Sequence, residues 1–188
     1  MIVKQNYLIN NQFLPFDVCD DIIKVADQQQ QEEATTQDGL NEKVRNSRIT
    51  WLADRWIYDW IDSYIVQVNK EVGWNFDFIG AEQIQFTRYS EGQFYGWHQD
   101  SNFKEEYERK ISVVIPLSNS EDYEGGDLQF YDSLQRPEAK ESRIMKDENT
   151  RTRGSIIIFP SYIYHRVTKV TKGQRLSIVL WYKGEKWK

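Results

Sequence analysis

The sequence is poor in cysteine and in long apolar runs, and each shortage excludes a class of protein. Its 188 residues include a single cysteine, Cys19, so a fold stabilised by internal disulfides is excluded. No run approaches the roughly 18 consecutive apolar residues that a membrane-spanning helix needs. The opening MIVKQNYLIN lacks the basic and apolar regions of a secretory signal. These absences favour a cytoplasmic protein with no membrane role.

An excess of positive charge is also missing. Lys and Arg number 24 against 29 Asp and Glu, which gives a net charge of -5 at pH 7. A general attraction to nucleic acid or to anionic membranes is therefore not expected. Aromatic residues are plentiful at 14%, which disordered chains do not reach. Length and composition together predict one folded globular domain.

Two stretches in the first half of the chain have helical periodicity. In residues 17–31 the apolar side chains fall on roughly one helical face, with Asp17 or Asp20 as the N-cap. In residues 52–68 apolar side chains recur at steps of three and four, with Asp54 placed to cap the start. We expect both segments to be helices that pack against a core.

After Gly73 the period changes to two, which is typical of strands. The predicted strands are residues 84–89, 95–100, 111–117, 127–131, 155–159, 162–167 and 176–182. Helices followed by many short strands predict an α+β, mainly β fold, in which the N-terminal helices pack on a sandwich or barrel.

Two polar segments interrupt this pattern. Residues 28–41 predict a surface loop, and residues 133–153 predict a surface insertion or a long hairpin. Both are candidates for contact with a substrate. No internal repeat or compositional break marks a second domain, so we expect residues 1–188 to form a single domain.

The chain has only two histidines, and both fall in predicted strands. His98 and Asp100 are two residues apart, so in a strand they share a face, with Cα atoms about 6.5 to 7 Å apart. A sandwich could bring His165 opposite them. Two imidazoles and one carboxylate leave open positions on a metal ion, which suits Fe(II), although the same donors also bind zinc. A His-x-Asp pattern alone is weak, because this composition gives about 0.3 matches to His-x-Asp or His-x-Glu by chance.

A buried cation is predicted ten residues after the second histidine. Arg175, Ser177 and Trp181 share one face of a strand whose other face is aliphatic. An inward Arg beside an inward Ser is costly to bury unless an anion pairs with it. A small dicarboxylate fits, because a guanidinium pairs bidentately with a carboxylate and the hydroxyl adds a hydrogen bond. The alternative, a salt bridge on a solvent-facing strand, is about equally compatible with the periodicity.

These residues lie within three longer stretches, RYSEGQFYGWHQD, YEGGDLQFY and FPSYIYHRVTKVTKGQRLSIVLWY. Together they resemble the Fe(II)- and 2-oxoglutarate-dependent oxygenases, most closely the branch of prolyl 4-hydroxylase catalytic domains and bacterial PKHD-type hydroxylases. The resemblance runs from about Glu82 to Tyr182. It implies a double-stranded β-helix (jelly roll) core over residues 76–188, with residues 1–75 as a helical N-terminal support.

The resemblance also implies roles for individual residues. The implied iron ligands, which are also the catalytic residues, are His98, Asp100 and His165. Arg175 would bind the distal carboxylate of 2-oxoglutarate, with Ser177 and Tyr89 as helpers. The implied cofactors are Fe(II), the co-substrate 2-oxoglutarate and O2, with ascorbate as an optional addition. By contrast, we interpret Tyr95 as a packing residue, and the Glu-Gly-Gly-Asp sequence at 124–127 as a turn that needs positive φ.

The implied reaction is hydroxylation of a C–H bond with release of succinate and CO2, most naturally on a peptidyl residue, as in prolyl 4-hydroxylases. A free amino acid or another small molecule is an alternative substrate. An AlkB-type nucleic-acid demethylase is disfavoured, because Trp181 stands where that branch has a second Arg and because the chain is acidic. A non-enzymatic jelly-roll module that holds zinc or no metal stays open. Zinc hydrolysis is weaker, since no general-base Glu accompanies the histidines.

Overall fold

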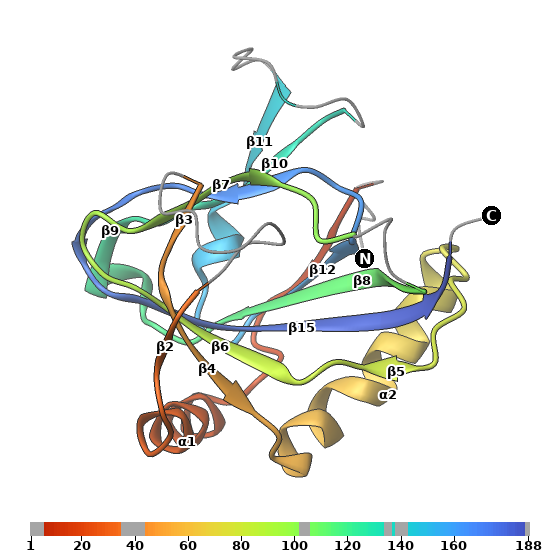
Figure 1. Ribbon diagram of the computed structural model, residues 1–188, viewed down its shortest axis with the longest axis horizontal. Coiled ribbons are helices and arrows are strands. Elements are labelled where there is room, and N and C mark those ends of the chain that lie inside the picture. Colours follow the sequence, from red (N-terminus) through yellow and green to blue (C-terminus); the bar gives the residue numbers. More distant parts are fainter. Residues whose placement is uncertain (1–5, 35–43, 102–105, 134–136, 138–142, 187–188) are drawn as a thin grey trace.

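The computed structural model describes residues 6–34, 44–101, 106–133, 137 and 143–186, and Figure 1 shows two facing β-sheets with both helices outside the larger one. The larger sheet contains β1 (Leu8–Asn10), β2 (Glu32–Glu33), β4 (Arg48–Leu52), β5 (Gly80–Ala81), β6 (Ile84–Tyr89), β8 (Tyr107–Pro116), β12 (Ile156–Pro160) and β15 (Arg175–Glu185). Its strand order is β1-β12-β8-β15-β6-β4-β2, and β5 pairs with β15.

The smaller sheet faces the inner side of the larger one. It contains β3 (Arg45–Asn46), β7 (Phe94–His98), β10 (Leu128–Tyr131), β11 (Ile144–Lys146) and β13 (His165–Val167). Its order is β11-β10-β13-β7-β3, while β9 (Tyr123–Gly125) and β14 (Val170–Gly173) form a separate pair. The described residues also include two short 3-10 helices, Ser120–Asp122 and Glu148–Arg151. All these pairings are antiparallel, as expected for the predicted jelly roll.

Helices α1 (Phe16–Asp27) and α2 (Arg55–Glu71) cover the outer face of the larger sheet (Figure 1). The predicted stripe of α2 is buried there, through Ile57, Ile61 and Ile65. Asp54 takes the N-cap position of α2, but its side chain makes no capping hydrogen bond.

The predicted ends of α1 were wrong. The helix begins one residue before Asp17, with Pro15 as its N-cap, so neither Asp17 nor Asp20 caps it. Pro15 has φ -58° and ψ 153°, so it lies just outside the first helical turn. The helix ends at Asp27, and the chain then contributes β2 to the larger sheet.

Strand alternation divides the protein into two cores. One face of β8 and β15 packs against the helices, and the register pairs Ile178↔Ile115 and Leu180↔Val113 lie on this face. The other face of the same strands joins a second core between the sheets, which includes Val114 and Tyr89. The residues predicted to share the Arg175 face of β15 therefore point between the sheets.

The first 75 residues contain strands as well as helices. β1 pairs with β12 and β4 pairs with β6, so this segment supplies parts of the larger sheet. In the segment 133–153, β11 pairs with β10 and forms one arm of a hairpin. The parts of the two predicted loops at 35–41, 134–136 and 138–142 lie outside the described residues. None of the described helices is long and apolar enough to cross a membrane.

Candidate metal centre and adjoining cavity

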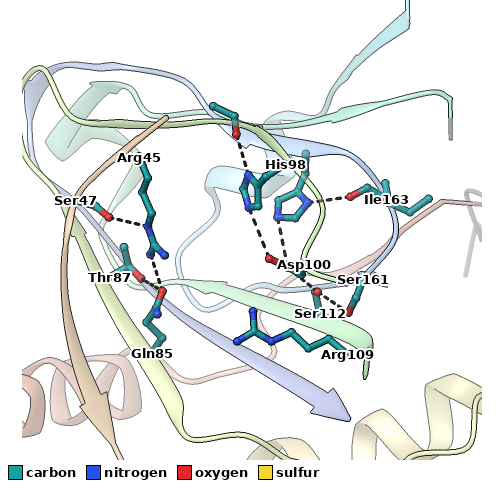
Figure 2. Close-up of polar contacts among 12 residues, drawn as sticks. Arg45, Ser47, Gln85, Thr87, His98, Asp100, Arg109, Ser112, Ser161 and Ile163 are labelled. Carbon is teal, nitrogen blue, oxygen red and sulfur yellow. Dashed lines mark hydrogen bonds and ion pairs between the residues drawn. The ribbon is translucent and has the colours of Figure 1, made fainter. Parts of the chain in front are cut away.

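Two histidines and one aspartate meet at one end of the smaller sheet (Figure 2). His98 ends β7 and His165 begins β13, and the two are register partners. Asp100 lies two residues beyond β7, where its backbone N–H donates to Ser161 O at 2.9 Å. One ligand atom from each of the three side chains lies within 4.8 Å of the others. The structure therefore brings together the three predicted ligands, although Asp100 is placed by a bend after the strand.

The hydrogen bonds of the two imidazoles fix which nitrogen faces the centre. Nδ1 of His98 lies 2.8 Å from Gly96 O, and Nδ1 of His165 lies 3.0 Å from Ile163 O. Because a carbonyl oxygen only accepts, each Nδ1 carries a proton, so Nε2 is the nitrogen that would present its lone pair to a metal ion. The two Nε2 atoms lie 3.6 and 3.5 Å from the oxygens of Asp100.

Buried hydroxyls hold the carboxylate. Ser112 donates to Oδ2 of Asp100 at 2.7 Å, and the hydroxyls of Ser112 and Ser161 are 2.9 Å apart (Figure 2). Burial alone raises the pKa of Asp100, but His165, His98, Arg109 and the Ser112 hydrogen bond outweigh burial and lower this pKa to about 2. Asp100 is therefore an anion at neutral pH.

The protonation of His98 follows from its surroundings. Burial, followed by the neighbouring His165, holds the pKa of His98 well below 6.5, so this imidazole is neutral. Two imidazole nitrogens with free lone pairs and a carboxylate on one side of a point are the donors of a facial two-histidine, one-carboxylate metal site. The residues present fit a divalent ion, and the same three residues line the cavity, where further ligands could reach it.

A cavity of about 240 Å³ adjoins this centre and reaches Arg175. Arg175 is only 2% exposed, which excludes the alternative of a surface salt bridge. Its Nη1 donates to Ser177 Oγ at 2.8 Å, while its buried Nη2 has no hydrogen-bond partner among the described residues. Tyr89 is the register partner of Arg175 and also lines the cavity. A buried guanidinium with an unsatisfied donor calls for an anion.

The lining of the cavity also includes two arginines that the sequence analysis missed. Arg45 donates to Gln85 Oε1 at 2.6 Å and to Ser47 Oγ at 3.2 Å (Figure 2). Arg109 donates to both carboxylate oxygens of Glu82, at 2.8 and 2.7 Å. No local pattern marks either arginine, because Gln85 and Glu82 are 40 and 27 residues away from them.

Each of these arginines lies against an aromatic ring that lines the cavity. The ring of Tyr95 stacks on His98 with centroids 3.4 Å apart, and the guanidinium of Arg45 lies over the Tyr95 ring, 4.6 Å from its centroid. Arg109 lies 3.7 Å from the ring centroid of Trp181, which lines the cavity as its place on the Arg175 face predicted. Tyr95 packs, as expected, but it packs on one of the proposed metal ligands.

An antiparallel jelly roll that presents two histidines and a carboxylate beside a buried cation is typical of a mononuclear metal enzyme. A family model described as the 2OG-Fe(II) oxygenase superfamily matches residues 84–183. This match covers more than half of the chain, so the protein belongs to that superfamily, whose chemistry uses Fe(II), 2-oxoglutarate and O2.

Curated relatives include bacterial PKHD-type hydroxylases. The chain is 36% identical over 99 residues to one from Parvibaculum lavamentivorans and 31% identical over 99 residues to one from Idiomarina loihiensis. Each match covers 53% of this chain and 41% of the relative. The chain thus matches less than half the length of these relatives.

Solved structures confirm the fold over nearly the whole chain. A prolyl-4-hydroxylase from Pseudomonas putida has a TM-score of 0.73 at 19% identity, with 95% of this chain and 93% of that chain covered. A prolyl hydroxylase from Trichoplax adhaerens, in complex with a hypoxia inducible factor peptide fragment, has a TM-score of 0.75 at 21% identity, covering 95% and 84%. The predicted jelly roll with N-terminal helices is confirmed.

Proposed function

We propose that the protein is an Fe(II)- and 2-oxoglutarate-dependent hydroxylase in which His98, Asp100 and His165 hold the iron. Arg175 would bind the distal carboxylate of 2-oxoglutarate. The observation that carries this proposal is the buried Nη2 of Arg175, which has no hydrogen-bond partner among the described residues and lies in the same cavity as the ligand set. A bound carboxylate would satisfy this donor and neutralise the buried charge.

The side chains around the cavity have separate tasks. Ser177 accepts from Arg175 and keeps its own hydrogen for the bound carboxylate. Tyr89 closes the cavity beside Arg175, and Val114 and Val179 line it with apolar surface that limits access of water. When bound, Fe(II) and 2-oxoglutarate would supply the oxidation that consumes O2, releases succinate and CO2, and hydroxylates a C–H bond.

For the substrate we propose a peptidyl residue, with proline as the first choice. The similarity in fold to two prolyl hydroxylases supports this choice. The name of the curated relatives supports hydroxylation as the reaction. The cavity of about 240 Å³ has room for a small dicarboxylate beside the proposed metal ligands.

We further propose that residues 1–188 act as one oxygenase domain. Support comes from the larger sheet, in which β1 and β4 pair with β12 and β6 from the second half of the fold. A cytoplasmic location is likewise a proposal, supported by the buried free thiol of Cys19.

The cofactor proposal is tested by adding Fe(II) and then 2-oxoglutarate under anaerobic conditions and recording the visible charge-transfer band of the chelate. Wild-type protein should give the band. Arg175→Met should need roughly 150- to 5,000-fold more 2-oxoglutarate, because losing one partner of a buried ion pair costs about 3 to 5 kcal/mol, while Fe(II) affinity is retained. A folded, iron-loaded wild type without the band would refute the proposal.

The substrate is tested separately with proline-rich peptides, free proline and methylated oligonucleotides. Mass spectrometry should find the gain of one oxygen atom on a peptide. Modification of free proline alone, or loss of a methyl group from an oligonucleotide, would reject the peptide proposal in favour of the small-molecule or the demethylase alternative.

A further inference from the structure

Arg175 is supported from outside the cavity by a glycine turn. Gly125 and Gly126, at the end of β9, have φ values of +69° and +65°. A Cβ on Gly126 would lie 3.1 Å from Cδ of Arg175 and 3.0 Å from Cγ2 of Val170. The backbone of Gly126 is therefore packed against the aliphatic stem of Arg175 and limits where its guanidinium can lie.

A second arginine fixes this turn. Arg151, at the end of a 3-10 helix, donates from Nη1 to Gly125 O at 2.5 Å and to Asp127 Oδ1 at 2.7 Å. Its Nη2 donates to Ser120 O at 2.9 Å and to Tyr123 O at 2.7 Å. The guanidinium also lies 4.1 Å from the centroid of the Tyr123 ring.

These contacts hold the segment 120–127 at both of its ends. Arg151 is not among the described residues that line the cavity beside the proposed metal ligands. These contacts connect Arg151 to the cavity in two steps. Arg151 hydrogen-bonds the turn at Gly125 and Gly126, and the turn packs against the aliphatic stem of Arg175. The guanidinium fork of Arg151 suits this task, because its fixed donors meet several backbone oxygens at once.

We infer that Arg151 is a positioning residue for 2-oxoglutarate binding: it holds the glycine turn against Arg175 and so places the guanidinium that meets the distal carboxylate. This inference rests on the proposed function. It predicts that Arg151 affects the affinity for a 2-oxo acid only when that acid has a distal carboxylate.

The test compares Arg151→Met with wild type in anaerobic Fe(II) titrations with two probes, 2-oxoglutarate and pyruvate. Pyruvate is a 2-oxo acid that lacks the distal carboxylate. We expect the Kd for 2-oxoglutarate to rise about 10-fold, which is about 1.4 kcal/mol, while the Kd values for pyruvate and for Fe(II) stay unchanged. In turnover, KM for 2-oxoglutarate should rise with little change in kcat.

Arg153→Met is the matched control, because it removes an arginine of the same segment that contacts Asp20 and Asn119 instead of the turn. It should bind 2-oxoglutarate as wild type does. Gly126→Ala reaches the turn without touching Arg151, and its methyl group should weaken 2-oxoglutarate binding selectively because it would meet the Arg175 stem. Because the inference requires the contact between the turn and Arg175, unchanged 2-oxoglutarate affinity in this second variant would overturn it even if Arg151→Met does not fold.

Three outcomes would overturn the inference. Unchanged 2-oxoglutarate affinity in a folded Arg151→Met or Gly126→Ala variant would show that the turn does not position Arg175. Equal losses for 2-oxoglutarate, pyruvate and Fe(II) would show a merely structural role. A wild type that binds Fe(II) but not 2-oxoglutarate would refute the proposed function and the inference with it, and this failure is recognised without any variant.

Discussion

Ser112 orients the carboxylate of Asp100, although Ser112 is not itself one of the proposed metal ligands. It is fully buried on β8, and its hydroxyl donates to Asp100 Oδ2 at 2.7 Å. Ser112→Ala removes this hydrogen bond and leaves the hydroxyl of Ser161 without its neighbour at 2.9 Å. We expect the variant to fold but to bind a divalent metal more weakly, because Asp100 loses the group that orients it.

The size of the effect follows from the kind of bond that is lost. A hydrogen bond to a charged group is worth about 1.5 to 3 kcal/mol. Ser112 and Asp100 are 0% and 5% exposed, so solvent water has little access to replace the missing donor. Outer-shell substitutions typically reduce metal affinity roughly 10- to 100-fold, or about 1.4 to 2.7 kcal/mol. The two ranges agree, so we expect a loss of affinity within them.

The assay is a titration of metal-free protein with Fe(II) under anaerobic conditions, and with Co(II) as an air-stable probe. Ser155→Ala is the matched control, because Ser155 is also fully buried but donates to Asn149 O and Thr152 O, away from the cavity. It should lose stability without losing metal affinity. Wild-type affinity in Ser112→Ala, or an equal loss in Ser155→Ala, would refute the reasoning.

Two further predictions concern parts of the fold away from the site. Cys19 is fully buried, and burial raises the pKa of its thiol to about 11. An aromatic disulfide reagent at pH 8 should therefore label Cys19 only after denaturation. Rapid labelling of the native protein would contradict this burial. Asn69→Ala should lower the free energy of urea unfolding by about 2 to 3 kcal/mol, because the Asn69 amide bonds both backbone groups of Phe76 at 2.9 and 3.0 Å. A loss below about 0.5 kcal/mol would show that water replaces these bonds.

Periodicity predicted the long elements of the fold well. The apolar faces of α2, β6, β8 and β15 each bury enough surface to determine which side of the element turns inward, and this is what periodicity detects. The two-residue strands β2, β3 and β5 could not be predicted in this way, because so short a segment becomes a strand only through the partner it pairs with. The start of α1 at Phe16 was missed for a different reason, because Asp17 and Asp20 were competing candidates for the N-cap that Pro15 occupies.

The sequence by itself determined the family chemistry. Strand alternation and motif resemblance were enough to predict the site residues. They gave the spacing of His98 and Asp100, the later His165, and the inward face of Arg175. Only the tertiary structure decided how these groups are held. Ser112 reaches Asp100 across 12 residues, Arg45 reaches Gln85 across 40, and Arg151 reaches the glycine turn across 26. Such contacts depend on the register of strands far apart in the chain, which no local pattern of residues encodes.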